Sequence, residues 1–271
     1  MKKILVTGSS GQLGSELKKI TRNKSNYIWI FVDKNSFNLS KVNEIFDKLS
    51  YFKPNLIINC AAYNNVNQAN NNFSKADLIN NIAVKKISDY SKLNLCKLIH
   101  FSTDYVYDGV SSKLINEGAS TNPINYYGKS KREGEVFIEK SFSESIIIRT
   151  SWLYSSNGKN FVNTIIKKAK IDNEINVVND QHGCPTYAKD LAEDTMRILT
   201  SKLKLNYDGK IYNYSNLGSA SWSDFAKKII KHSEIECQVR EISSLNLNSN
   251  VRRSKYLIRN KNKIINNFNL N

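Results

Sequence analysis

Apolar residues along this chain gather in short runs, and stretches with helical periodicity separate each run from the next. A short apolar run is typical of a buried strand, whereas apolar positions three or four residues apart indicate a helix. Strands and helices in alternation favour a parallel sheet with helices on both faces. We therefore expect an α/β fold on a doubly wound parallel sheet, with strands at 3–7, 27–33, 55–60, 97–102 and 145–150 and helices near 12–22, 40–50, 74–93 and 125–140.

The alternation ends after residue 151, and the rest of the chain predicts a smaller C-terminal lobe. Loops, a helix near 161–170 and a short strand at 175–178 follow in this part. A further apolar run and a helix with an N-terminal capping signal, together at about 210–232, indicate a return to the main sheet. Residues 1–151 are thus assigned to a first domain, and residues 152–271 mainly to a lobe that is interleaved with it.

A glycine-rich turn joins the first predicted strand to the first predicted helix, with Gly8, Gly11 and Gly14 at three-residue spacing. Glycine permits a sharp turn and close approach of the backbone to a pyrophosphate, and a helix N-terminus favours the phosphate charge. Asp33 closes the second predicted strand, where a carboxylate can accept from the adenosine ribose. An ordinary glycine turn is the alternative, but the order of strand, helix, strand and acid favours a dinucleotide-binding Rossmann domain at 1–151.

Tyr127 and Lys131 stand four positions apart in the helix expected near 125–140, so they share one helix face. A cation beside a phenol lowers its pKa, and we expect Lys131 to make Tyr127 a better proton donor near neutral pH. Of the 14 tyrosines, only Tyr127 has a lysine four residues later. Thr103 closes the fourth predicted strand, where its hydroxyl can polarise a carbonyl or, alternatively, cap the strand end. This pattern indicates a general acid that acts on a carbonyl substrate.

The amino-acid composition limits the kinds of partner that we expect for this protein. The formal net charge is +16, but the lysines are scattered among many Asn and Ile residues, so we expect an anionic small substrate and no nucleic acid. No apolar stretch approaches the roughly 20 residues of a membrane span, so no membrane partner is expected. The four cysteines lie far apart, with neither a CxxC pair nor a histidine at metal spacing. We therefore expect buried or incidental thiols and a reducing, cytoplasmic setting.

Together these residues resemble the dTDP-4-dehydrorhamnose reductase family of extended short-chain dehydrogenase/reductases. The resemblance implies reduction of the 4-keto group of a dTDP-linked 6-deoxy-4-ketohexose to give dTDP-L-rhamnose, with NADPH or NADH as the hydride source. Related sugar-nucleotide dehydratases carry an acidic pair after the strand-four threonine, whereas Tyr105 takes the second position here and favours simple reduction. The segments that carry the resemblance are 7–14, 59–63, 100–109, 149–152 and 180–186, together with Tyr127 and Lys131.

The resemblance also implies a role for individual residues. Tyr127 would protonate the nascent alkoxide, Lys131 would hold the nicotinamide ribose, and Thr103 would hydrogen-bond the keto oxygen. The expected cofactor-binding residues are Gly8, Ser10, Gly11, Gln12, Leu13, Asp33, Asn38, Leu39, Cys60, Ala61, Ala62 and Tyr63, with Tyr127 and Lys131. The expected substrate-binding residues are Val66, Thr103, Asp104, Tyr105 and Trp152.

Some positions depart from the family pattern. Asn67 and Asn70 stand where the family usually shows Asp and Glu, so polar contacts near the sugar are expected to differ. The segment that begins at Val251 lacks the family's proline, and we expect the sequence to end before the family's final helix. Arg252 or Arg253 could bind the substrate diphosphate, and a solvated basic tail is the alternative.

The sequence leaves both the cofactor preference and the product undecided. Asp33 favours NADH because it would repel a 2′-phosphate, while the neighbouring Lys34 would admit NADPH. The stereochemistry of the product is not set either, so a reductase of a different nucleotide-linked 4-keto-6-deoxy sugar is the main competitor. A non-catalytic regulatory subunit of the same fold is a second competitor. Some members of the family are dimers bridged by a metal through C-terminal acids, and these acids have no counterpart here, so we expect no metal and a homodimer only loosely.

Overall fold

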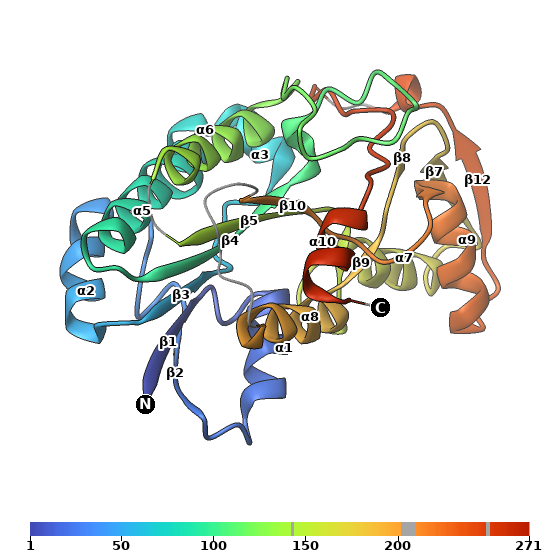
Figure 1. The fold of residues 1–271 in the computed structure, drawn as a ribbon. Coiled ribbons are helices and arrows are strands. Elements are labelled where there is room, and N and C mark those ends of the chain that lie inside the picture. Colours follow the sequence, from blue (N-terminus) through green and yellow to red (C-terminus); the bar gives the residue numbers. More distant parts are fainter. Residues whose placement is uncertain (142–143, 202–209, 248–249, 271) are drawn as a thin grey trace.

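The computed structural model describes residues 1–141, 144–201, 210–247 and 250–270. Its centre is a six-stranded parallel sheet with the strand order β10-β5-β4-β3-β1-β2 (Figure 1). The order reverses direction at β1, so the predicted doubly wound α/β sheet is confirmed. The strands are β1 (Lys2–Thr7), β2 (Tyr27–Val32), β3 (Leu56–Asn59), β4 (Lys97–Thr103), β5 (Ser145–Thr150) and β10 (Ile211–Asn213).

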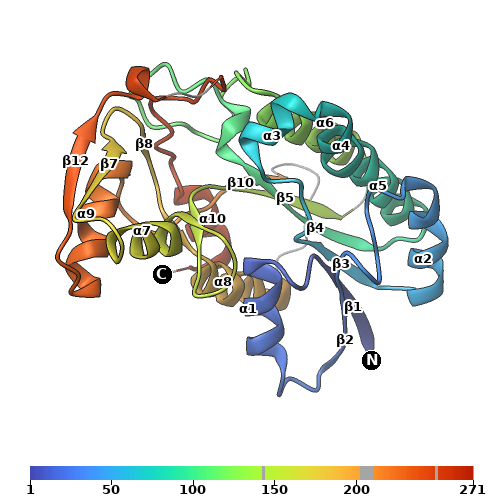
Figure 2. The same cartoon turned by 180° about the vertical axis from the view of Figure 1, so that it is seen from behind.

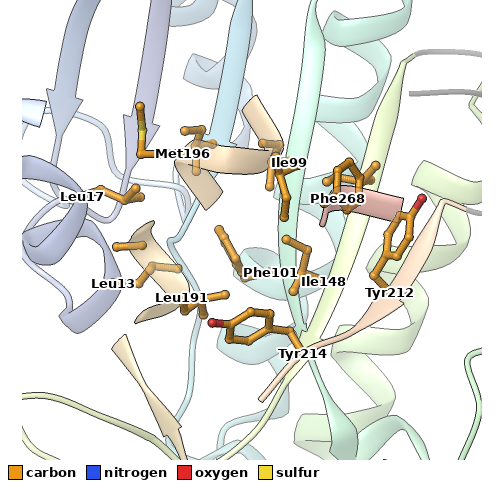
Figure 3. Packing of buried hydrophobic residues seen from close by; sticks show 14 of the residues in the cluster. Leu13, Leu17, Ile99, Phe101, Ile148, Leu191, Met196, Tyr212, Tyr214 and Phe268 are labelled. Atoms are coloured by element: carbon orange, nitrogen blue, oxygen red, sulfur yellow. The ribbon is translucent and has the colours of Figure 1, made fainter. Parts of the chain in front are cut away.

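Helices cover both faces of this sheet, as Figures 1 and 2 show. One face carries α2 (Ile45–Phe52), α5 (Ala83–Leu93) and α6 (Tyr126–Lys140), and the other carries α1 (Gln12–Thr21), α8 (Ala188–Thr200) and α10 (Asn262–Phe268). Residues along a strand point to alternate faces, so each strand supplies both layers of the core. Figure 3 shows the second layer, where side chains from α1, α8 and α10 pack against β4, β5 and β10.

The long helix expected at 74–93 has three parts: α4 (Phe73–Asp77), a π-helical segment η2 (Leu78–Ile82) and α5. The helix expected near 40–50 begins with a 3-10 turn, η1 (Val42–Glu44), and continues as α2. A short helix, α3 (Val66–Asn71), precedes α4. The π segment displaces the helix by one residue, a local insertion that the apolar periodicity cannot reveal.

The smaller lobe has its own core, in which α7 (Phe161–Ala169) and α9 (Trp222–Ser233) pack together beside β7 (Glu174–Val178) and β12 (Gln238–Ile242). β7 and β12 form a parallel pair. The short strands β6 (Leu153–Tyr154) with β9 (Thr186–Tyr187), and β8 (His182–Gly183) with β11 (Ala220–Ser221), make two further pairs.

Two expectations about the last third of the chain need correction. The run at about 210–232 returns to the main sheet only as β10, whereas α9 packs in the smaller lobe because its apolar face meets α7. The expected absence of a final helix is wrong, because α10 buries Ile264 and Phe268 against the sheet. Two 3-10 turns, η3 (Asp104–Val106) and η4 (Ser244–Asn246), complete the described elements. No helix among the described residues has the length and apolar character to cross a bilayer.

Candidate active site

A cavity of about 760 Å³ opens where β1, β3, β4 and β5 end, and it extends toward the smaller lobe. Ligands of open α/β sheets bind beyond the carboxyl ends of the strands, so this is the expected place for a site. Most of the residues predicted from the sequence line it. They are Gly8, Ser10, Gly11, Gln12, Leu13, Asn38, Leu39, Cys60, Ala61, Ala62, Val66, Thr103, Asp104, Tyr105, Tyr127, Lys131 and Trp152.

The glycine turn has the backbone geometry that a dinucleotide requires. Gly8 adopts a φ of +65°, and a Cβ there would lie 2.8 Å from the backbone of Ala61. A Cβ on Gly14 would collide with the carbonyl oxygen of Gly8. Gly11 stands at the N-cap of α1 without a side-chain cap, and the first turn of α1 holds no acidic residue. The first N–H groups of α1 therefore suit a pyrophosphate.

Asp33 and Tyr63 lie outside the lining of this cavity. The Oδ1 atom of Asp33 accepts from the backbone N–H groups of Asn35 and Ser36, at 3.0 Å each, and the hydrogen bonds with Ser36 hold the pKa of Asp33 low. The carboxylate thus caps a tight turn. Its neighbour Lys34 lines the cavity instead, so a basic rather than an acidic residue lies at this end of the site.

Tyr127 lies in the first turn of α6, which Asn125 caps by accepting from the N–H of Gly128 at 2.9 Å. Its surroundings exclude water, and this desolvation raises the pKa of the phenol, while a hydrogen bond with Thr103 acts in the opposite direction. The net effect is a pKa of Tyr127 above its usual value. The expected lowering of the Tyr127 pKa by Lys131 is therefore wrong, and the group that opposes desolvation comes from β4.

The ammonium of Lys131 points toward β4. It donates to the carbonyl oxygen of Phe101 at 2.6 Å and lies 3.2 Å from Nε2 of His100. Burial lowers the pKa of Lys131 to about 8, although the charge of Glu135 one turn along α6 favours the protonated form. Sharing a helix face brings Tyr127 and Lys131 to one cavity, but β4 sets the direction of the lysine.

The capping role of Thr103 is confirmed, since its hydroxyl caps η3, and the residue also lines the cavity, where its expected contact with a substrate carbonyl stays a prediction. Its Oγ1 accepts from the N–H of Tyr105 at 3.2 Å and donates to Oδ1 of Asp104 at 3.3 Å. Asp104 is buried, which raises its pKa, and its Oδ2 has no hydrogen-bond partner among the described residues. The rings of Tyr105 and Tyr127 meet edge to face with centroids 6.0 Å apart.

Trp152 follows β5 in a left-handed conformation, with a φ of +45°. Its indole stacks on that of Trp222, and a Cβ on Gly183 would collide with it. Phe161 packs on Trp222 at a centroid distance of 4.4 Å. Trp222 and Phe161 also line the cavity, although no local sequence signal marks either, because they come from the distant elements α9 and α7.

The basic residues of the C-terminal segment separate into two kinds. Arg253 lines the cavity, and its Nη2 donates to Oδ1 of Asn67 at 2.9 Å, whereas Arg252 is exposed. Lys159 and Lys168 also line the cavity. These cations suit an anionic substrate.

Asn70, the other departure from the family pattern, accepts a hydrogen bond from the backbone N–H of Tyr126 at the start of α6.

Two supporting contacts were not visible in the sequence. Asn80, inside the π segment η2, bonds the backbone of Tyr63 through both its amide atoms and donates to Oγ of Ser130 at 3.1 Å. It thereby connects the segment after β3 to α6. Arg149 on β5 and Glu135 on α6 form a buried two-bond ion pair at 2.9 and 2.7 Å.

Comparisons with known proteins agree with this geometry. The family model described as the RmlD substrate binding domain matches residues 1–271. The chain is 35% identical over 258 residues to the spore coat polysaccharide biosynthesis protein SpsK of Bacillus subtilis, a match that covers 95% of this chain and 89% of the relative. It is 36% identical over 228 residues to the dTDP-4-dehydrorhamnose reductase of Aggregatibacter actinomycetemcomitans, covering 83% and 77% respectively.

Among solved structures, the chain is similar to the dTDP-4-dehydrorhamnose reductase of Bacillus anthracis in complex with NADP. The two have a TM-score of 0.92 and 35% sequence identity, and the match covers 98% of this chain and 93% of the other. A family match along the whole sequence and a near-complete structural superposition point to the same group. The chain therefore belongs to the RmlD substrate binding domain family.

Proposed function

We propose that this protein reduces the 4-keto group of dTDP-4-dehydro-L-rhamnose to the alcohol of dTDP-L-rhamnose, with NADPH or NADH as cofactor. The observation that carries the proposal is the meeting of Thr103, Tyr127 and Lys131 in one cavity with the glycine turn. The similarity to dTDP-4-dehydrorhamnose reductases supports the choice of substrate.

The residues around the cavity divide the chemistry among them. The bound dinucleotide supplies the hydride. Tyr127 holds the proton, because its raised pKa keeps the phenol protonated at neutral pH until negative charge develops on the keto oxygen. Thr103 orients that oxygen through its hydroxyl, and the protonated Lys131 holds the ribose next to the reacting ring.

The same residues favour reduction over dehydration. Elimination of water needs a second proton donor and a base beside the first acid. Tyr105 takes the position of the second acidic residue. Burial raises the pKa of its phenol to about 12, so the phenol stays protonated near neutral pH and cannot serve as the base. A one-step reduction requires only the hydride and the proton of Tyr127.

A reductase of a different nucleotide-linked 4-keto-6-deoxy sugar is the second candidate. Asn67, where the family usually shows an acid, holds Arg253 at the cavity with a neutral amide, so the sugar and diphosphate contacts differ from the common pattern. A non-catalytic regulatory subunit is disfavoured, since Thr103, Tyr127 and Lys131 all line the cavity.

A substrate panel tests the proposal. Purified protein is given dTDP-, UDP- and GDP-linked 4-ketohexoses with NADPH or NADH, cofactor absorbance is followed, and the product sugar is identified. We expect turnover with dTDP-4-dehydro-L-rhamnose and a dTDP-L-rhamnose product. Turnover of another sugar alone would support the second candidate, and cofactor binding without turnover of any would support the regulatory subunit.

We also propose a cytoplasmic setting and leave a homodimer as a prediction. All four cysteines are free thiols, which suits a reducing compartment. Light scattering of the purified protein measures the mass in solution and decides between monomer and dimer.

A further inference from the structure

Four buried polar side chains, the last of which is Lys131, form a row across the sheet. Thr7 of β1, Asn59 of β3 and His100 of β4 are paired positions on neighbouring strands. Thr7 Oγ1 lies 2.6 Å from Asn59 Oδ1, Asn59 Nδ2 lies 3.0 Å from His100 Nδ1, and His100 Nε2 lies 3.2 Å from Lys131 Nζ. None of the four is more than 1% exposed. Such a row of polar groups in a sheet core is costly unless every group is satisfied.

This row matters because Lys131 has no direct carboxylate partner among the described residues. The nearest acid on its own helix, Glu135, is bonded to Arg149. The hydrogen-bond partners of the ammonium are the Phe101 carbonyl oxygen and the ring of His100. A buried ammonium without a carboxylate partner depends on such acceptors.

We propose that His100 is a positioning residue, whose neutral ring accepts a hydrogen bond from the Lys131 ammonium through Nε2 while Asn59 holds the ring proton on Nδ1. An ammonium has donors only, so Nε2 must accept, and a neutral imidazole then carries its hydrogen on Nδ1. In the structure Asn59 Oδ1 accepts from Thr7 Oγ1 and Nδ2 faces Nδ1 of His100. The two amide atoms have nearly the same shape, and a half-turn of the amide lets Oδ1 accept the hydrogen of Nδ1. Nδ2 then donates to Oγ1 of Thr7, which also accepts from the N–H of Ala61 at 3.3 Å.

The charges around Lys131 agree with a neutral His100. Burial, and next the charge of Lys131, hold the pKa of His100 well below its usual value, so the ring does not compete for the proton near neutral pH. The other titratable groups near Lys131 are Tyr127 and Glu135 on α6, Asp104 and Tyr105 on η3, Cys60 after β3, and Arg149 through its pair with Glu135. Of these, Glu135 is the group that raises the pKa of Lys131.

Titration of Lys131 itself tests this role. Protein labelled with carbon-13 at the lysine ε position is titrated by NMR from neutral to strongly alkaline pH, and the resonance missing in Lys131→Met identifies Lys131. In His100→Leu the midpoint should fall by about one to two pH units, because a hydrogen bond to the charged form is lost. His100→Gln, which keeps an acceptor, should restore it, and His232→Leu should leave it unchanged. An unchanged midpoint in a folded His100→Leu protein would overturn the inference.

A second measurement needs no variant. The nitrogen-15 shifts of the His100 ring in the unaltered protein at neutral pH should show a hydrogen on Nδ1 and a bare Nε2. A hydrogen on Nε2, or a charged ring, would refute the assignment even if the Leu variant failed to fold.

The inference rests on the proposed function only for its catalytic meaning, since both measurements are made without substrate. If the enzyme reduces no sugar nucleotide but the Lys131 midpoint moves as expected, the proposed function fails and the role of His100 stands. If the enzyme reduces the sugar nucleotide but the Lys131 midpoint is unchanged in His100→Leu, the proposed function stands and the role of His100 fails.

Discussion

The indole of Trp152 lies flat on the indole of Trp222, with ring centroids 3.4 Å apart and planes 9° apart. One ring follows β5 of the main sheet, and the other begins α9 of the smaller lobe. The stack therefore joins the two sides of the cavity at the wall assigned to the sugar nucleotide. It also supports Trp152 in a left-handed backbone conformation that a bulky residue rarely adopts.

Replacing Trp222 tests this wall. In Trp222→Leu the indole of Trp152 loses its stacking partner, and we expect KM for the nucleotide sugar to rise by about tenfold, the equivalent of one aromatic contact. Steady-state kinetics give KM, and quenching of NADPH fluorescence on the same variant gives the cofactor Kd as an internal control. An unchanged KM would remove the stack from substrate binding.

Removing the phenol hydroxyl of Tyr127 should stop the chemistry and leave the site assembled. We expect Tyr127→Phe to lower kcat by at least about 10², with cofactor affinity preserved, because the proton donor alone is lost. Tyr126→Phe changes the neighbouring tyrosine, which does not line the cavity, and serves as the matched control. Near-normal turnover in Tyr127→Phe would exclude Tyr127 as the acid.

Cofactor choice should depend on Lys34 more than on Asp33. Lys34 lines the cavity while the Asp33 carboxylate caps a turn, so Lys34→Ala should raise the Kd for NADPH by roughly tenfold and leave that for NADH nearly unchanged. Lys24→Ala, which removes a charge outside the cavity, controls for net charge. A stronger loss of discrimination in Asp33→Ala than in Lys34→Ala would assign the selection to the carboxylate.

Burial of Lys131 predicts a dependence of stability on pH. Its pKa is about 8 in the fold against 10.5 as the ordinary value, so between these pH values the unfolded chain binds more protons. The contribution of this group to the free energy of unfolding therefore rises with pH across that window, by about 3 kcal/mol at most. Urea denaturation across the window should show the unaltered protein gaining stability relative to Lys131→Met. A constant difference between the two would contradict the lowered pKa.

The buried pair of Arg149 and Glu135 should be strongly coupled. Arg149→Met removes both bonds from Arg149 to the buried Glu135 carboxylate and leaves it only the bond from Arg132 Nη1 at 3.1 Å, so we expect a loss of about 3 kcal/mol in the free energy of unfolding. The double variant Arg149→Met/Glu135→Leu should recover most of that loss, since neither charge remains. In a double-mutant cycle, losses of unfolding free energy that simply add would show that the two side chains act independently.

Local pattern was sufficient to predict the sheet and which strand ends meet at the cavity, whereas the family resemblance supplied most of the individual lining residues. Strand tails of a parallel sheet meet at one edge, so Gly8, Ala61 and Thr103 could be brought together without any knowledge of packing. Trp222 and Phe161 could not be predicted in this way, because they reach the cavity only through the packing of α9 on α7.

Hydrogen-bond competition explains the remaining differences. The Asp33 carboxylate has the position expected for a ribose ligand, but nearby N–H groups in its own turn occupy Oδ1. Lys131 shares a helix face with Tyr127 as expected, yet its ammonium is directed by acceptors on β4 that the helix pattern does not contain.

The return of the chain to the sheet as β10, after α7 and before α9, has a consequence for how the two halves can move. Neither half is one continuous piece of sequence, so the smaller lobe cannot be expressed as one uninterrupted segment of the natural chain. The chain crosses between the halves several times, so any motion of one half against the other has to bend all of these connections together.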